Sequence, residues 1–218
     1  FDGLEVSGSV GPGVHSTSGG AMQGSDWVLH NNTKQGVIVD RATVVVEGMH
    51  LANNGYSAAH VLDARRIDFW NLTAENNGAS PSATVEEQAG LYYFESNTVE
   101  SASGDVRCRN CSISGSTGQG VLAVNSVDLW LEGLHLEDNN PTMPAFEVDN
   151  GDTMPGGASG RVQVTNAHVE AETPGQPAVK FHRAAVEVNG LTMAGNHSGL
   201  EWRGDNNGQF PSYLNNSV

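Results

Sequence analysis

Short stretches in which every second residue is apolar recur along the chain. In Val44–Leu51, Val44 and Val46 point to one side and Val45 to the other, and the alternation resumes after Gly48. This period of two residues is typical of a half-buried β-strand on each side of a one-residue corner. Copies of the same pattern occupy residues 67–74, 106–113, 129–136, 162–169 and 186–193.

The residue between the two strands of each copy is glycine or asparagine. These residue types adopt a positive φ at the lowest cost, so a left-handed bend is predicted at each corner. Leu4–Gly8 is interpreted as an earlier strand that ends at a corner of the same kind, Gly8. The predicted corners of the regular repeats are Gly48, Asn71, Asn110, Gly133, Asn166 and Gly190.

A polar loop and a third short strand follow each copy. Three short strands per repeat with no helix between them predict an all-β chain that forms a parallel β-helix, a solenoid of about seven to eight coils. Residues 1–218 are expected to form one domain, with irregular first coils at 1–36, regular coils at about 37–203 and a polar tail at 204–218. No capping helix is predicted, so we expect flanking domains or other chains to cover the ends of the solenoid.

The repeated strand–(Gly/Asn)–strand, polar loop and aliphatic strand pattern resembles the right-handed β-helix superfamily, which includes pectate lyases, other polysaccharide lyases and phage tailspikes. The resemblance covers roughly residues 37–203 and implies a right-handed solenoid. The Gly and Asn corners look like the position of that superfamily's asparagine ladder. Because the fold supports lyases, hydrolases, epimerases and inert stalks alike, the resemblance does not by itself assign a function.

The charge balance is strongly acidic, with 25 Asp plus Glu against 10 Lys plus Arg. This argues against a nucleic-acid partner, because phosphates require a cationic face. No apolar run reaches the length of a membrane span, so no membrane insertion is expected. The composition fits a secreted or cell-surface protein, a saline habitat or a cation-binding surface.

Cys108 and Cys111, the only cysteines, flank the Asn110 corner. A redox C-x-x-C motif would begin a helix in a βαβ unit, and a zinc site would need a second pair of ligands. Neither context is found in the sequence. Both side chains are expected inside the solenoid as small core residues, free or disulfide-linked.

The strands that follow the loops are expected to present two outward columns of side chains. The last three coils carry six ionisable groups in these columns, the densest charge cluster of the chain. One interpretation is a site for an acidic polysaccharide, and the other is a ladder of cross-strand ion pairs that stabilises the sheet. The columns are Ile38, Val61, Tyr92, Leu122, Glu147, Lys180 and Glu201, and Asp40, Asp63, Phe94, Val124, Asp149, His182 and Arg203.

A lyase acting on a uronate polymer must neutralise the substrate carboxylate, remove the C5 proton and protonate the leaving oxygen. Lys180 is the candidate base and Arg203 the candidate clamp or acid, with His182 beside them. Glu147 and Asp149 are candidate calcium ligands. A Lys and an Arg on successive coils resemble the arrangement in chondroitinase B-like and alginate lyases, but the calcium-binding acids that closely precede the lysine there are missing here.

Aromatic side chains supply a candidate sugar-binding surface. Tyr92 and Phe94 form an apolar patch on the middle coils, and Trp130 lies beside Arg107 on the strand before the corner, where it can stack on a sugar. Glu201 is the candidate polar contact in the last coil.

On the strand after the corner, two histidines are expected on adjacent coils. They are close enough for a metal ion, but no third ligand of matching register is present, and an exposed polar ladder is the expected role. The predicted column is His50, Thr73, Ser112, His135, His168 and Thr192.

Three functions remain open from the sequence. The missing catalytic motifs favour a secreted or cell-surface module with a structural, adhesive or carbohydrate-binding role and a polysaccharide or other glycan as partner. The charge cluster favours instead a calcium-assisted lyase. A stack of coils also suits a segment of a phage or virus fibre.

Overall fold

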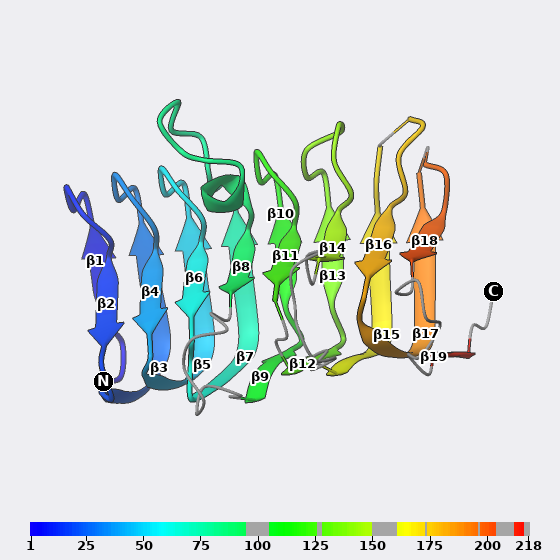
Figure 1. Cartoon of the computed structure of the whole chain (residues 1–218). Coiled ribbons are helices and arrows are strands. Elements are labelled where there is room, and N and C mark those ends of the chain that lie inside the picture. Colours follow the sequence, from blue (N-terminus) through cyan, green and yellow to red (C-terminus); the bar gives the residue numbers. More distant parts are fainter. Residues whose placement is uncertain are drawn as a thin grey trace.

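The computed structural model describes residues 1–94, 105–125, 128–149, 161–172, 174–195 and 197–203, together with the backbone of 212–215. Within these residues the regular structure is almost entirely β (Figure 1). The elements are β1 (Glu5–Ser7), β2 (Val14–Thr17), β3 (Ala21–His30), β4 (Val37–Asp40), β5 (Thr43–Ala52), β6 (Ala59–Leu62), β7 (Arg66–Glu75), the 3₁₀ turn η1 (Glu86–Gln88), β8 (Leu91–Phe94), β9 (Asp105–Arg109), β10 (Ser112–Ser114), β11 (Val121–Val124), β12 (Asp128–Glu132), β13 (His135–Glu137), β14 (Phe146–Asp149), β15 (Arg161–Glu170), β16 (Val179–His182), β17 (Ala185–Ala194), β18 (Leu200–Arg203) and β19 (Ser212–Asn215).

The strands form two all-parallel sheets, which confirms the predicted β-solenoid. An 11-stranded sheet, here the bent sheet, follows the order β1-β3-β5-β7-β10-β13-β15-β12-β9, with β17 and β19 added beyond β15. The second sheet has 8 strands in the order β18-β16-β14-β11-β8-β6-β4-β2. β19 lies in the stretch that was expected to be an unpatterned tail.

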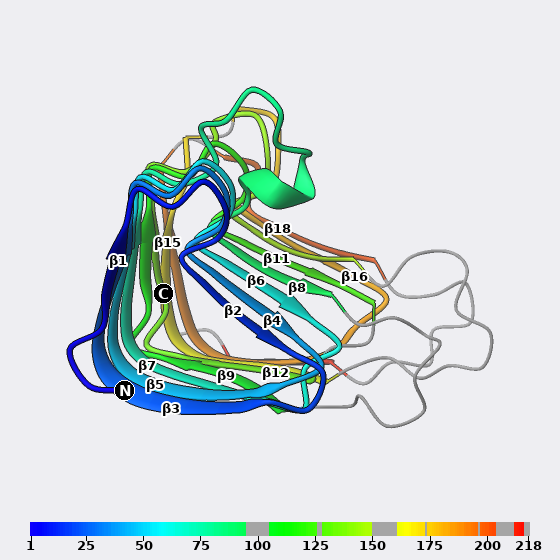
Figure 2. The same cartoon turned by 90° about the vertical axis from the view of Figure 1, so that its left-hand side faces the viewer.

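Each coil runs along the bent sheet, turns a corner within it, and then crosses to the second sheet. Seen along the solenoid, the bent sheet supplies two sides and the second sheet the third (Figure 2). We call the strand residues before the corner the first arm and those after it the second arm. β5 passes through both arms, and Gly48 at its corner is skipped in the pairing with β7.

All six predicted corners have the left-handed backbone that was expected. Their φ values are 70° at Gly48, 53° at Asn71, 52° at Asn110, 63° at Gly133, 51° at Asn166 and 74° at Gly190. The corner placed at Gly8 was wrong. β1 pairs with the second arm of β3, so the corner of the first coil is Gly3, with a φ of 67°, and Gly8 belongs to the following loop. Asp26, with a φ of 54°, is the corner of the next coil.

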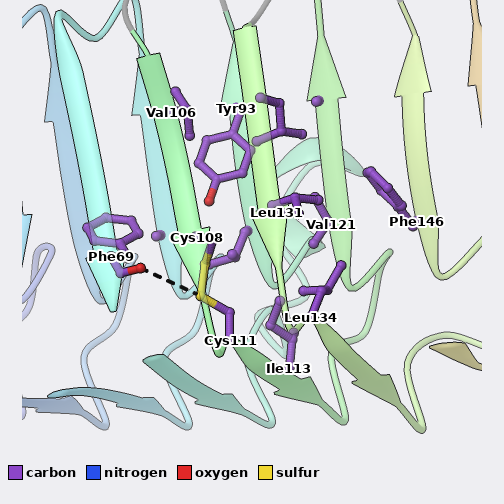
Figure 3. Close-up of a cluster of buried hydrophobic side chains, with 14 of the residues drawn as sticks. Phe69, Tyr93, Val106, Cys108, Cys111, Ile113, Val121, Leu131, Leu134 and Phe146 are labelled. Atoms are coloured by element: carbon purple, nitrogen blue, oxygen red, sulfur yellow. Dashed lines mark hydrogen bonds between the residues drawn. A yellow bond between two sulfur atoms is a disulfide. The ribbon is translucent and has the colours of Figure 1, made fainter. Parts of the chain in front are cut away.

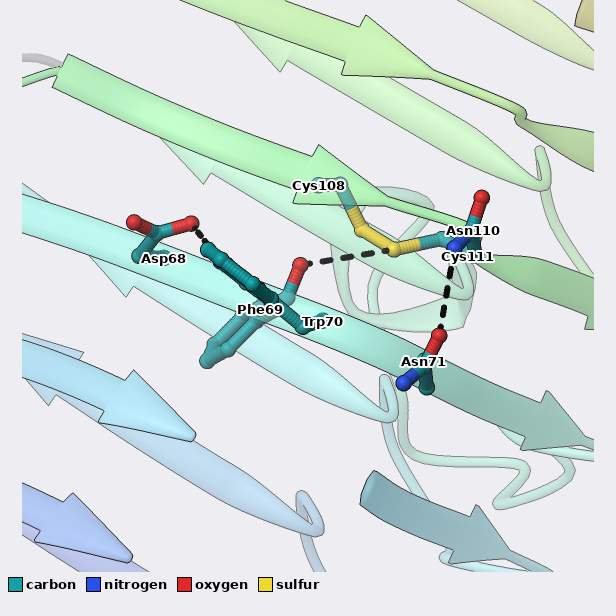
Figure 4. Close-up of a disulfide and its surroundings, with 7 residues drawn as sticks. All are labelled: Asp68, Phe69, Trp70, Asn71, Cys108, Asn110 and Cys111. Atoms are coloured by element: carbon teal, nitrogen blue, oxygen red, sulfur yellow. Dashed lines mark hydrogen bonds between the residues drawn. A yellow bond between two sulfur atoms is a disulfide. The ribbon is translucent and has the colours of Figure 1, made fainter. Parts of the chain in front are cut away.

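A buried asparagine ladder lies beyond the second arm and not at the Gly/Asn corner, so its expected position was wrong. Asn32 Nδ2 donates to Asn54 Oδ1 and Asn54 Nδ2 donates to Asn77 Oδ1, each over 2.9 Å. These side chains lie where the chain leaves the bent sheet, and they satisfy backbone groups that the turn leaves without strand partners. At the corner itself, exposed Asn110 donates to Asn71 over 3.2 Å (Figure 4).

The interior is a continuous column of aliphatic and aromatic side chains from all three sides of the solenoid (Figure 3). Cys108 and Cys111 belong to this core and form a disulfide across the Asn110 corner (Figure 4). They are 0% and 1% exposed, so the expected inward orientation is confirmed and the pair is disulfide-linked. Trp27, also fully buried, fills the core near the N-terminal end of the solenoid.

The register predicted for the second sheet is wrong by one residue in β6. Ile38 pairs with His60 and His60 with Tyr92, so His60 and Leu62 point outward. Val61 is instead 2% exposed and faces the core. The register of the second arm is as predicted, from His50 through His135 and His168 to Thr192.

The insertion at Asn76–Gln88 contains η1 and projects from the junction between the second arm and the second sheet (Figures 1 and 2). The insertion predicted at Asp149–Gly160 lies outside the described residues apart from Asp149. No helix in the described part of the chain has the length and apolar character to cross a membrane.

Candidate functional site

β9, a middle strand of the first arm, presents Arg107 and Arg109 on the outer surface. Val106 and Cys108 are buried between them, because successive side chains of a strand point to opposite faces. Each arginine therefore stands in an outward column that runs across the neighbouring coils of the solenoid.

Arg109 stacks on Trp70 of β7, one coil toward the N-terminus. Its Cζ lies 4.5 Å from the ring centroid, and the indole nitrogen of Trp70 donates a hydrogen bond to Asp68 (Figure 4). Trp70 nevertheless remains 40% exposed. Among the residues that the structure describes, no carboxylate lies within ion-pairing distance of Arg109. Its guanidinium donors are thus available to an external acceptor.

Arg107 stacks in the opposite direction, on Trp130 of β12, with Cζ 4.1 Å from the ring centroid. It also forms an ion pair with Asp105, over 3.0 Å. The predicted neighbourhood of Trp130 and Arg107 is therefore confirmed. A guanidinium over an indole ring gains roughly 0.5–1 kcal/mol at an exposed site. Because this contact already restricts the arginine side chain, less conformational freedom is lost when it binds an acid group.

Two hollows lie on this arm, one beside β9 and one nearer the N-terminal end of the solenoid. One, of about 220 Å³, lies between β9, β12 and β15, with Arg109, Trp130 and Gln163 among its walls. The other, of about 610 Å³, lies over β3, β5 and β7 and ends at Trp70. Strands in a sheet are about 4.8 Å apart, so six neighbouring strands give a strip of about 24 Å along the solenoid. The first-arm face is therefore long enough for several sugar units.

The charged residues predicted on the second sheet are paired with one another. Lys180 Nζ contacts Glu147 Oε1 over 2.5 Å, and the other carboxylate oxygen of Glu147 accepts a hydrogen bond from Gln119 over 2.9 Å. Glu147 is only 9% exposed. To act as a base, Lys180 would have to leave this carboxylate.

The two remaining pairs lie beside Lys180 on the same sheet. His182 Nδ1 is 2.9 Å from Asp149 Oδ1 on the adjacent strand, and Arg203 Nε is 2.5 Å from Glu201 Oε1 within β18. The structure brings these groups together as contacting acid–base pairs. Roles for Lys180, His182 and Arg203 in catalysis, and for Glu201 in substrate binding, stay predictions.

The candidate calcium ligands Glu147 and Asp149 lie on one strand and point outward together. Both carboxylates already contact a basic side chain. Within the described ranges, no group of three or more His, Cys, Asp or Glu side chains is placed to hold a metal ion. Calcium at this position stays a prediction.

Tyr92 and Phe94 are adjacent, with ring centroids 6.4 Å apart. Tyr92 is only 8% exposed because it packs with Ala89 and Leu122, and burial, helped by Glu86, raises the pKa of its phenol to about 12. Little of Tyr92 is therefore available to a sugar. Its role in substrate binding stays a prediction.

His60, which the sequence register missed, packs edge-on against Tyr92 with ring centroids 4.7 Å apart. Its Nδ1 lies 3.3 Å from Gln35 Nε2, so in the tautomer protonated on Nε2 the ring accepts a hydrogen bond from this amide. Burial lowers the pKa of His60, although Glu87 and Glu86 oppose the shift. The imidazole is neutral at physiological pH.

On the second arm, the rings of His135 and His168 stack with centroids 5.1 Å apart and an interplanar angle of 9°. Parallel rings direct their nitrogens side by side and not toward one point. This geometry agrees with the polar ladder predicted for the column.

The pairing of Trp70 with Arg109 was missed in the sequence because only one outward column of the first arm was considered. The second column is formed by the residues directly before each corner. In the sequence, this second column already places a tryptophan in one coil and an arginine in the next. The column is Ser25, Glu47, Trp70, Arg109, Glu132, Thr165 and Asn189.

No protein-family model matches the sequence, and no curated protein matches it. Among solved structures, an alginate lyase from Paenibacillus sp. str. FPU-7 matches with a TM-score of 0.48 and 15% sequence identity. The match covers 91% of this chain and 78% of the lyase chain. The assignment of the site therefore rests on its geometry.

Proposed function

We propose that this protein is a secreted or cell-surface carbohydrate-binding module, a right-handed parallel β-helix of seven or eight coils, whose first-arm face binds an acidic glycan. The observation that carries the proposal is the pair of oppositely directed Arg–Trp stacks on β9. Each stack combines a planar cation with an aromatic surface. A guanidinium binds a carboxylate through two parallel hydrogen bonds, and an indole packs on the apolar face of a sugar ring.

An acidic ligand can bind this face although the chain carries a net charge of −15. At physiological ionic strength, exposed charges are screened beyond about 8 Å, so a ligand responds mainly to the groups that it touches. The first-arm face collects half of the arginines of the chain. They are Arg66, Arg107, Arg109 and Arg161. Three of them already contact a carboxylate of the same face, so Arg109 is the cation of this group that has no ion pair with a described residue.

The test is calorimetric titration of the protein with polygalacturonate and with a neutral glucan of similar length. Arg109→Gln keeps a polar side chain but removes the charge, and we expect at least a tenfold loss of affinity for polygalacturonate, since hydrogen bonds to charged groups contribute about 1.5–3 kcal/mol. Arg41→Gln, a charge-matched variant of an arginine that pairs with Asp40 at another corner, should have little effect. Equal losses in the two variants would contradict the proposed site.

A lyase centred on Lys180 is a second candidate, supported by the partly buried chain of contacts from Gln119 through Glu147 to Lys180. The protein would be incubated with uronate polymers and calcium, and the ultraviolet absorbance of unsaturated products would be followed. Product formation that disappears in Lys180→Ala would establish this activity. Binding without product formation would leave the module as a binding protein.

A further inference from the structure

Gln163 on β15 lies at the C-terminal end of the smaller hollow, beside Trp130 in the adjacent coil. Its amide nitrogen donates to Glu187 Oε2 over 2.7 Å, on the other side from Trp130. Arg161 donates to the same carboxylate oxygen over 2.8 Å. These hydrogen bonds, first that from Gln163 and then that from Arg161, lower the pKa of Glu187, so the acceptor is ionised at neutral pH.

The two ends of an amide differ in chemistry, since the nitrogen only donates hydrogen bonds and the oxygen only accepts them. With its nitrogen held by Glu187, the amide of Gln163 turns its oxygen away from that residue. No hydrogen bond from a described residue satisfies this oxygen. A fixed acceptor therefore stands at one end of a hollow whose other end carries the unpaired donors of Arg109.

We propose that Glu187 is a positioning residue that holds the Gln163 carbonyl toward the hollow, so that this end of the site binds a sugar hydroxyl and rejects a second acid group. This selectivity depends on the glycan-binding function proposed above and specifies which acidic glycans the site accepts. A carbonyl oxygen accepts the hydrogen of a hydroxyl, whereas a carboxylate or sulfate has no hydrogen to offer and is repelled. The site then takes polymers whose acid groups alternate with free hydroxyls and discriminates against densely sulfated ones.

The proposal is tested with polygalacturonate and dextran sulfate on wild type, Glu187→Gln, Gln163→Ala and the double variant. We expect the wild type to prefer polygalacturonate. In Glu187→Gln the acceptor loses its charge and gains an N–H group that can donate to the Gln163 oxygen, so the amide of Gln163 is no longer held in one orientation and can present its N–H groups. The preference should then shift toward dextran sulfate by about three- to tenfold, the range for one ordinary hydrogen bond. Glu132→Gln removes one charge from the same hollow without touching Gln163 and should shift both affinities alike.

The double variant separates the amide from Arg161, which Glu187→Gln also releases. If the shift in preference persists in the double variant, it comes from Arg161, and the proposal is overturned. If the shift in preference is lost when Gln163 is also replaced by alanine, the shift caused by Glu187→Gln depends on the Gln163 amide.

The side-chain amide signals of Gln163 provide a readout that needs no glycan. The hydrogen bond to the carboxylate shifts one of the two N–H signals downfield and slows its solvent exchange, and Glu187→Gln should weaken both effects. Unchanged signals would overturn the positioning role. If the wild type binds neither polymer while the amide signals respond as expected, the glycan-binding function and its selectivity fail, and the positioning of Gln163 alone stands.

Discussion

Replacement of Asn54 by alanine tests whether the asparagine ladder is a principal source of stability. The side chain is fully buried and makes four hydrogen bonds. Its oxygen accepts from the backbone and side-chain nitrogens of Asn32, and its nitrogen donates to Leu29 O and to Asn77 Oδ1. At a net value of about 1 kcal/mol each, the variant should lose about 4 kcal/mol of unfolding free energy. That is a large part of the roughly 5–15 kcal/mol that stabilises a typical domain.

Asn139 offers a matched control within the same molecule. It occupies the equivalent position in a later coil but makes two side-chain hydrogen bonds, from Ser116 N and to Ile113 O. Asn139→Ala should therefore cost about half as much, roughly 2 kcal/mol. Urea unfolding followed by far-ultraviolet circular dichroism gives both values. If Asn54→Ala is no more destabilising than Asn139→Ala, the reasoning from hydrogen-bond number is refuted.

Three further predictions concern the corners, the disulfide and a buried histidine. Gly48→Ala should lower the free energy of unfolding, measured with urea, by about 1–2 kcal/mol, because φ is +70° and the added Cβ would lie 2.9 Å from Asp26 Oδ1. Gly48→Asn should lower it less, and equal losses would contradict the argument from left-handed geometry. Replacing both Cys108 and Cys111 by alanine should lower the free energy of unfolding by about 2 kcal/mol, the contribution from closing a four-residue loop in the unfolded chain. An unchanged free energy of unfolding would contradict this entropic contribution. The folded-state pKa of His60 lies below its ordinary 6.5, so the unfolded chain binds more protons than the folded chain and stability should fall as the pH decreases below about 6.5. The unfolding temperatures of wild type and His60→Gln, measured between pH 7.5 and pH 5 (about the titration range of histidine), should converge at the acidic end. A constant difference between the two unfolding temperatures would exclude this coupling.

The corners and the inward columns could be predicted because both follow from local rules. Gly48 and Asn71 indicate a positive φ by residue type, and alternation on either side then assigns each neighbour to the core or the surface. Asp26 was overlooked because aspartate adopts this conformation less often than glycine or asparagine. The one-residue error in β6 arose because Val61 was placed after Ile38 in the outward column, whereas Ala59 and Val61 are the apolar residues that face the core.

The candidate site was predicted less completely than the fold. Arg107 and Trp130 stand in the same column, and register alone brings them together. Arg109 and Trp70 also share an outward column, but the residues directly before the corners were not interpreted as a column, and 39 residues separate the two in the sequence. The predicted cross-strand contacts of Glu147 with Lys180 and of Asp149 with His182 are present, whereas Arg203 contacts Glu201 on its own strand, a choice that register does not determine.

The stacking of coils in register also restricts how such a binding surface can change during evolution. Every coil contributes one strand to the first arm, so duplication or loss of a coil changes the length of the strip in steps of about 4.8 Å. Extra residues placed in a loop, as at Asn76–Gln88, leave the spacing of the outward columns unaltered. The length of ligand that the protein can hold and the loops that surround it are thus adjusted by two independent kinds of genetic change.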